Sequence, residues 1–134
     1  STDLSDQQSH MKIEHKKVNF EDSRGSIRDI FVDEPKDHCT IIFTKTGGVR
    51  GNHYHKVSTQ TDYIVSGKMK VFGKKPEAEV TRATVMPGDY ISWEPMEIHA
   101  FVAEEDTVFI TFIEGPRGGE EYETDTVRVS PIHE

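Results

Sequence analysis

The stretch from Gly47 to Gly67, GGVRGNHYHKVSTQTDYIVSG, decides the fold of this chain. It carries the pair His53 and His55 within a run of residues typical of β-strands. Because side chains two apart on a strand point to the same face, the two imidazoles are expected to project together, toward the inside of a barrel if that face is buried. Two adjacent buried imidazoles are costly without a partner, so this face is expected to hold a metal or to face a substrate.

The spacing within this stretch resembles the first sequence motif of the cupin superfamily. Five residues separate Gly47 from the pair His53-X-His55, four separate the pair from Gln60, and six separate Gln60 from Gly67. The one departure is Gln60, which stands where the family usually has Glu. The resemblance implies a cupin fold, an all-β, single-domain barrel of the RmlC-like jelly-roll type.

A second motif of the same superfamily follows further along the chain. Pro87-Gly88-Asp89, Pro95 and His99 match it in order, although Glu97 stands where Gly is common and the spacing to His99 is one residue tight. The two motifs together cover the central half of the chain. They are much more specific for the fold than for any one activity.

Composition sets the broad class. The chain has 134 residues, which suits one domain, with 11–134 expected as the barrel and the polar, non-periodic residues 1–10 as a leader outside it. The formal charge of −8 argues against nucleic acid or an anionic membrane as partner, and no apolar run is long enough to span a bilayer. The single cysteine, Cys39, indicates a reducing cytoplasm and is expected to be a small buried residue on a strand.

Short alternating segments separated by Gly, Pro and Asp turns predict a sandwich or barrel without a helix of convincing length. The segment 115–119 is rich in glycine and no helix follows it, so it is expected to be a surface loop rather than a phosphate site. Trp93 and the strand phenylalanines are expected in the core, and the glutamates, Glu97 among them, on a solvated surface. The expected strands are 12–20, 26–32, 39–44, 49–55, 60–66, 69–72, 78–85, 90–93, 99–103, 107–114 and a weak one within 120–129.

The cupin resemblance implies that His53, His55, Gln60 and His99 converge on one point inside the barrel. Three imidazoles and an oxygen suit Zn, Fe, Mn, Ni or Cu, and the spacing does not choose among these metals. A glutamine is a weaker ligand than glutamate, so the set is also open to metal-free acid–base chemistry, for which histidine is suited because it titrates near neutral pH. A merely structural cluster is the third interpretation.

Two further motifs resemble the deoxysugar-nucleotide branch of the cupins, the dTDP-4-keto-6-deoxyhexose epimerases and the 3,4-ketoisomerases. They are the turn Asp22-X-Arg24-Gly25 and the run Arg50-Gly51-Asn52-His53. The resemblance implies a nucleotide-linked keto-sugar as substrate and His53 or His55 as the base. Arg50 is then expected to neutralise the diphosphate or an enolate, with Arg24 and Lys56 as further ligand-binding candidates.

A second proton donor is sought among the tyrosines, with Tyr63 as the candidate catalytic residue beside Tyr54 and Tyr90. Strand alternation puts Tyr54 opposite the histidines unless Gly51 introduces a bulge. The ketoisomerases usually have a small residue at this position, and no clear match is found for the later Tyr and Asp of the epimerases.

These residues and resemblances are compatible with three alternative functions. The first is an isomerase or epimerase of a nucleotide-linked keto-sugar in surface polysaccharide synthesis. The second is a metal-binding small cupin, dioxygenase-like or related, that acts on a small molecule. The third is a non-catalytic sugar-binding cupin. A homodimer is expected because exposed sheet edges need cover.

Overall fold

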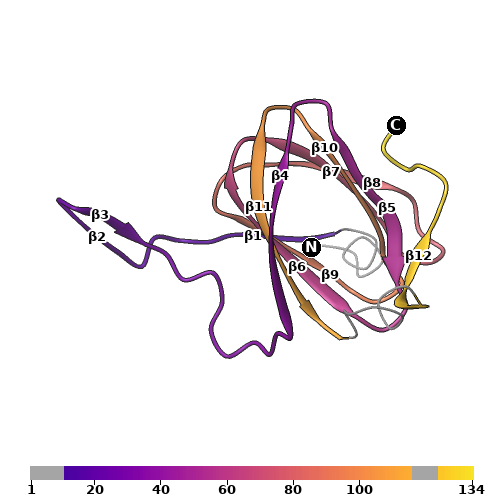
Figure 1. Cartoon of the computed structure of the whole chain (residues 1–134), viewed down its shortest axis with the longest axis horizontal. Coiled ribbons are helices and arrows are strands. Elements are labelled where there is room, and N and C mark those ends of the chain that lie inside the picture. The colour runs from indigo at the N-terminus through magenta and orange to yellow at the C-terminus, as the bar shows by residue number, and fades with distance from the viewer. Residues whose placement is uncertain (1–10, 116–123) are drawn as a thin grey trace, which may run out of the picture.

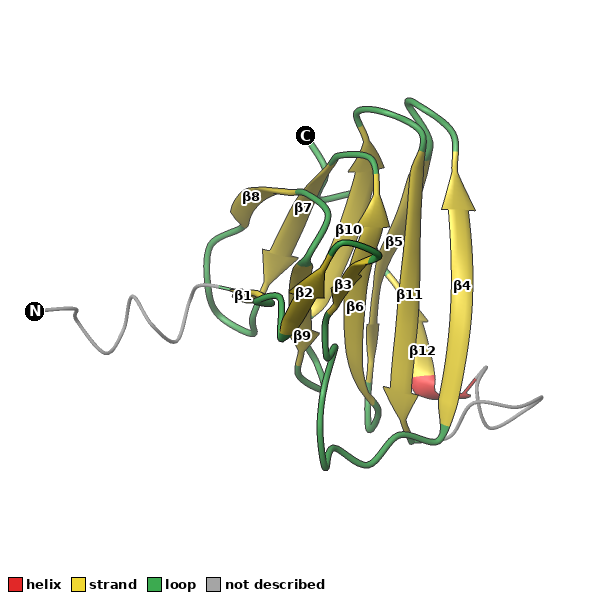
Figure 2. Cartoon of the chain, turned by 90° about the vertical axis from the view of Figure 1, so that its left-hand side faces the viewer, coloured by secondary structure: helices red, strands yellow, loops and turns green. Residues whose placement is uncertain are grey.

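Two five-stranded antiparallel sheets face each other across the barrel (Figures 1 and 2). The computed structural model describes residues 11–115 and 124–134, and within these it contains twelve strands. The first sheet contains, in spatial order, β1 (Lys12–His15), β9 (Asp89–Trp93), β6 (Thr59–Ser66), β11 (Thr107–Glu114) and β4 (His38–Thr44). The second contains β12 (Thr126–Arg128), β5 (Val49–His55), β10 (Ile98–Ala103), β7 (Met69–Lys74) and β8 (Thr81–Val85).

The core lies between the two sheets, where inward-facing side chains of both sheets meet. Trp93 and Phe109 from the first sheet and Phe101 from the second are almost fully buried, as the sequence predicts for strand aromatics. On the interior strand β11, the alternation that turns Phe109 and Ile113 inward follows the period of two that a strand requires. Burial of this apolar surface is the main stabilising contribution of the fold.

A β-bulge interrupts β5 at Gly51 and Asn52. The register between β10 and β5 shifts between His99 and Ala100, and both bulge residues have positive φ, 89° for Gly51 and 57° for Asn52. A Cβ atom on Gly51 would lie 2.6 Å from the carbonyl oxygen of His99. Because the bulge adds one residue to β5, Arg50 comes to the same face as His53 although the two are an odd number of residues apart.

A third, two-stranded element projects from the barrel. β2 (Phe20–Asp22) pairs with β3 (Gly25–Ile27), and Figure 1 shows this hairpin reaching away from both sheets. Its apolar side chains Phe20 and Ile27 are exposed. The strand predicted at 26–32 is thus limited to β3, because residues 28–32 leave the hairpin without a pairing partner strand in the described part of the chain.

Two burial predictions are wrong. Cys39 lies on a strand as expected but is exposed, because β4 is the edge strand of its sheet and nothing described covers its outer face. Glu97 is buried rather than solvated, and its Oε1 accepts a hydrogen bond from the backbone N–H of Glu94 at 3.0 Å. The polar leader predicted at 1–10 and the loop residues 116–119 lie outside the described residues.

None of the helical segments in 11–115 and 124–134 has the length and apolar character of a membrane span.

Candidate functional site

Three histidines meet inside the barrel on adjacent strands of the second sheet. His53 and His55 come from β5 and His99 from β10, where His99 is the direct strand partner of His53. One ring nitrogen from each lies within 4.8 Å of the others, and the ring centroids are 4.7 to 5.3 Å apart. The structure therefore brings together the three histidines that the two motifs indicate.

His99 is the most deeply buried member of this cluster. Its Nδ1 donates a hydrogen bond to the carbonyl oxygen of Glu97 at 3.1 Å, and the ring of Trp93 stacks on it at 5.1 Å. Burial, followed by the nearby His53 and His55, holds the pKa of His99 well below its ordinary value, so the ring is neutral. Its Nε2 has no hydrogen-bond partner in the described part of the chain and presents a lone pair.

His55 lies between two acceptors. Its Nε2 is 3.0 Å from Oε1 of Gln60, and because an amide oxygen only accepts, Nε2 is the donor. Its Nδ1 lies 3.3 Å from the hydroxyl of Thr126 and 3.7 Å from Oδ2 of Asp125. The carboxylate near Nδ1 would stabilise a second proton on this ring.

Asp125 is a site residue that the sequence analysis does not identify. It is buried, and its carboxylate also accepts hydrogen bonds from the backbone N–H of Val57 at 2.7 Å and from the hydroxyl of Ser58 at 2.6 Å. These bonds fix the carboxylate beside His55. No spacing signal links it to the histidines, because the pairing of β12 with β5 joins segments that are far apart in the sequence.

The amide nitrogen of Gln60 bonds a second buried carboxylate, that of Asp62. Nε2 of Gln60 lies 3.1 and 3.2 Å from the two oxygens of Asp62, which also accept bonds from Trp93 Nε1 at 2.8 Å and Thr111 Oγ1 at 2.6 Å. Burial raises the pKa of Asp62 to about 6, although the three hydrogen bonds act in the opposite direction. The alternation of β6 could have revealed Asp62, since residues 60 and 62 share a face.

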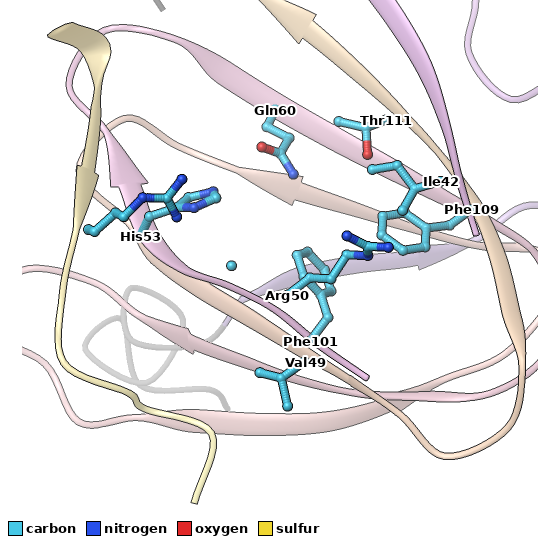
Figure 3. A pocket seen from close by; sticks show the side chains of 10 residues that line it. Ile42, Val49, Arg50, His53, Gln60, Phe101, Phe109 and Thr111 are labelled. Atoms are coloured by element: carbon cyan, nitrogen blue, oxygen red, sulfur yellow. The ribbon is translucent and has the colours of Figure 1, made fainter. Parts of the chain in front are cut away.

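An open cavity of about 380 Å³ adjoins the cluster. His53 and Gln60 line it, whereas His55 and His99 lie behind its wall. Figure 3 shows His53 at one end of the labelled group and Phe109 at the other, with Arg50 between them. Its lining also includes Ile42, Val49, Gly51, Phe101, Thr111 and Arg128.

The cavity wall carries two cationic side chains from different strands. Arg50 is held by bonds from Nε to Thr44 Oγ1 at 2.8 Å and from Nη2 to the carbonyl oxygen of Phe43 at 2.9 Å, so it retains N–H donors for a ligand. Arg128, which pairs with His53 across β12 and β5, is the second. The sequence analysis identifies Arg50 but not Arg128, which lies in the weakly predicted last strand.

None of the predicted tyrosine donors lines this cavity. Tyr63 is an odd number of residues from the inward-facing Gln60, and its hydroxyl accepts a bond from Arg28 Nη1 at 3.2 Å on the outer side of the sheet. The hydroxyl of Tyr90 bonds Glu34 and Thr61, each at 2.9 Å, and burial raises its pKa. Tyr54 stays opposite the histidines because the bulge precedes His53 and leaves the alternation from 53 to 55 intact.

Two predicted ligand-binding residues also lie away from the cavity lining. Arg24 is at the tip of the projecting hairpin, where its guanidinium bonds the carboxylate of Asp22 at 2.7 and 3.1 Å. This partner lowers the pKa of Asp22. Lys56 is exposed beyond the end of β5, and its backbone N–H donates to the carbonyl oxygen of Asp125.

The donor set fits a divalent transition metal in part. Three imidazole nitrogens within 4.8 Å of one another are a typical ligand set for such ions, and Nε2 of His99 offers a bare lone pair. Nε2 of His55 would have to release Gln60 to act as a ligand, because a ligating nitrogen carries no proton.

Solved structures similar to this chain include sugar-nucleotide epimerases and ketoisomerases. The dTDP-4-dehydrorhamnose 3,5-epimerase of Sulfolobus tokodaii is 20% identical, with 90% of this chain and 82% of that chain covered and a TM-score of 0.74. The sugar 3,4-ketoisomerase of Thermoanaerobacterium thermosaccharolyticum in complex with TDP is 18% identical, with 89% and 88% covered and a TM-score of 0.74. The 3'-monoepimerase of Streptomyces bikiniensis in complex with dTDP-quinovose is 14% identical, with 91% and 70% covered and a TM-score of 0.76.

No family model and no curated protein matches the sequence. The structural likeness confirms the RmlC-like cupin fold that the two motifs predict.

Proposed function

We propose that this chain, an RmlC-like cupin barrel, is an isomerase or epimerase of a nucleotide-linked keto-sugar in surface polysaccharide synthesis. The observation that carries the proposal is a single cavity onto which one histidine and two arginines open. The names of the similar structures support the substrate class, since two of them hold TDP or a dTDP-sugar. The expected cytoplasmic location rests on the composition alone.

His53 is the proposed base, because it is the histidine of the cluster that lines the cavity. It takes the proton from the carbon next to the ketone. The electron pair of the broken C–H bond forms a C=C bond to the ketone carbon, and the π pair of the C=O bond moves onto the oxygen to give an enolate. Return of a proton to the opposite face of the same carbon gives epimerisation. Return to the former ketone carbon gives isomerisation where the deprotonated carbon bears a hydroxyl: the enolate oxygen takes up a proton, and that hydroxyl loses its proton to become the new ketone. His55, with Asp125 behind it, holds a proton beside this exchange.

The rest of the cavity suits a nucleoside diphosphate. Arg50 and Arg128 supply charge-assisted donors for phosphate oxygens. Phe101 and Phe109 offer apolar ring surface for a base or sugar, although both also belong to the core.

Binding of nucleotides tests the substrate class directly. Saturating dTDP or a dTDP-sugar should raise the melting temperature, because a ligand that binds only the folded state stabilises it, whereas thymidine should raise it much less. A melting temperature that neither dTDP nor UDP sugars change would exclude the sugar-nucleotide function. Binding without turnover of any keto-sugar would instead favour the non-catalytic sugar-binding cupin.

A metal-dependent, dioxygenase-like activity is the second candidate, and the convergence of His53, His55 and His99 favours it. Gln60 is the fourth candidate ligand through its Oε1. A bound metal would supply a Lewis acid at the cavity wall. Elemental analysis of untagged protein purified without chelator tests it: a stoichiometric transition metal that is lost in the His99→Ala variant supports this function, and its absence after reconstitution opposes it.

We also propose a homodimer, supported by the apolar surface that the barrel leaves uncovered. Phe20 and Ile27 are exposed on the projecting hairpin, and Ile41 and Phe43 on the edge strand β4. Exposed apolar side chains gathered on a projecting arm and an unpaired strand edge are typical of surfaces that a partner covers.

A further inference from the structure

Asp62 is a fully buried carboxylate for which the proposed proton transfer has no direct use. It does not line the cavity, and its hydrogen-bonded link to the histidines runs through one side chain, Gln60. Burial of a carboxylate costs free energy unless its oxygens accept hydrogen bonds, so Asp62 is expected to have a role at this position.

All three side-chain partners of Asp62 are donors. Trp93 Nε1 and the amide nitrogen of Gln60 can only donate, and the hydroxyl of Thr111 donates at 2.6 Å. An ionised carboxylate only accepts, so the NH₂ end of the Gln60 amide must face Asp62. The opposite orientation would put the amide oxygen against both carboxylate oxygens.

The other end of the same amide faces His55. With its nitrogen fixed on Asp62, Gln60 can present only its carbonyl oxygen to Nε2 of His55, 3.0 Å away. A carbonyl oxygen requires a proton on that nitrogen. The carboxylate of Asp62 therefore determines, through the orientation of the Gln60 amide, which nitrogen of His55 carries the proton.

We propose that Asp62 is a positioning residue that acts through Gln60: it fixes the amide so that the proton of neutral His55 stays on Nε2. Nδ1 then remains on the side of Thr126 and Asp125, where a second proton would meet the carboxylate of Asp125. The ring is thereby held in one tautomer next to His53, with ring centroids 5.1 Å apart. The tautomer itself does not depend on the proposed function, because it exists in ligand-free protein. Only its catalytic role rests on that function.

The tautomer can be observed directly by nitrogen NMR of the imidazole rings in ligand-free protein, in mildly alkaline buffer, which favours neutral rings. We expect the wild-type His55 signal to be that of an Nε2-protonated ring. In Asp62→Asn the new amide can donate to Gln60, so the Gln60 amide is free to turn and the proton of His55 moves at least partly to Nδ1. Asp106→Asn is the matched control, since Asp106 is exposed and bonds Thr46, and it should leave the His55 signal unchanged.

A bare Nε2 in the wild type, or an unchanged tautomer in folded Asp62→Asn, would overturn the proposal. Should that variant fail to fold, Gln60→Leu keeps the test open, because it removes the acceptor at Nε2 and should shift the proton in the same direction. With a keto-sugar substrate, Asp62→Asn should lower kcat by about 10- to 100-fold with little change in KM. A wild type without isomerase activity would refute the proposed function and leave the tautomer result standing.

Discussion

Nδ1 of His55 lies 3.7 Å from Oδ2 of Asp125, and both side chains are at most 3% exposed. This contact joins the first cupin motif to a strand that the sequence predicts only weakly. It places a negative charge where a proton added to His55 would sit.

Asp125→Asn should therefore make protonation of His55 less favourable, because the neutral amide no longer stabilises the imidazolium. We expect kcat for the keto-sugar to fall by about 10- to 100-fold. Loss of the charged acceptor at Ser58 and Val57 should also lower the free energy of unfolding by about 1–3 kcal/mol. Imidazole NMR titration and steady-state kinetics check these effects, and an unaltered His55 titration would show that the contact carries no charge coupling.

Arg50→Lys should weaken an anionic ligand more than a neutral one, since the planar fork is lost while the charge remains. The affinity for dTDP should fall roughly tenfold and that for thymidine much less. Arg82→Lys is the matched control, because Arg82 is exposed and bonds the carbonyl oxygen of Glu134 instead. Calorimetric titration measures both ligands, and equal losses would rule out phosphate contact by Arg50.

Gly51→Ala should damage the bulge that brings Arg50 and His53 to one face. The added Cβ meets the carbonyl oxygen of His99 at 2.6 Å, at a φ of +89° that side chains rarely adopt. Gly47→Ala is a close control, since φ is +84° there and nothing lies within 4 Å of the added atom. Urea unfolding should show a loss of about 1 kcal/mol at residue 47 and at least 2 kcal/mol more at residue 51. Similar losses of unfolding free energy at both positions would mean that backbone strain at positive φ, rather than the contact with His99, causes the effect.

The pH dependence of stability should contain a contribution from Asp62. Its folded pKa of about 6 lies above the ordinary value of 3.8, so between these values the folded protein binds more protons than the unfolded chain. This contribution is fully present below pH 3.8 and is lost as the pH rises through 6, by about 3 kcal/mol. The lowered pKa of His99 acts in the opposite direction below 6.5, so the comparison of wild type with Asp62→Asn isolates the carboxylate. Parallel curves of melting temperature against pH for the two proteins would refute the shift.

Phe20→Asp should convert the proposed dimer to a monomer, because it puts a charge on the exposed hairpin. Met86→Asp is the control at similar exposure, 54% against 52% for Phe20, on a turn of the barrel. Light scattering coupled to gel filtration gives the masses. A wild type that is monomeric at high concentration would remove the basis for the dimer.

The sequence predicts the barrel well because its signals are local. The strands Val49–His55 and Thr107–Glu114 have the predicted bounds, and the three histidines of two motifs converge as the cupin pattern implies. Alternation with a period of two and turn residues are visible in any single stretch of sequence.

The parts that the sequence does not predict depend on contacts between distant segments. Asp125 and Arg128 reach the site because β12 pairs with β5, and no local pattern reports that pairing. Glu97 is buried because its neighbours enclose it, whereas Cys39 is exposed because β4 ends up at a sheet edge. The bulge at Gly51 shows the same limit, since it changes which side of β5 Arg50 occupies.

Exchange of solvent deuterium into a dTDP-4-keto-6-deoxyhexose, followed by proton NMR, tests most directly whether His53 moves a proton next to a ketone. We predict deuterium at a carbon adjoining the ketone with the wild type, and a rate lower by about 100-fold or more with folded, dTDP-binding His53→Asn. Nucleotide binding with no exchange above the protein-free control, or equal exchange in the wild type and His53→Asn, would contradict this account.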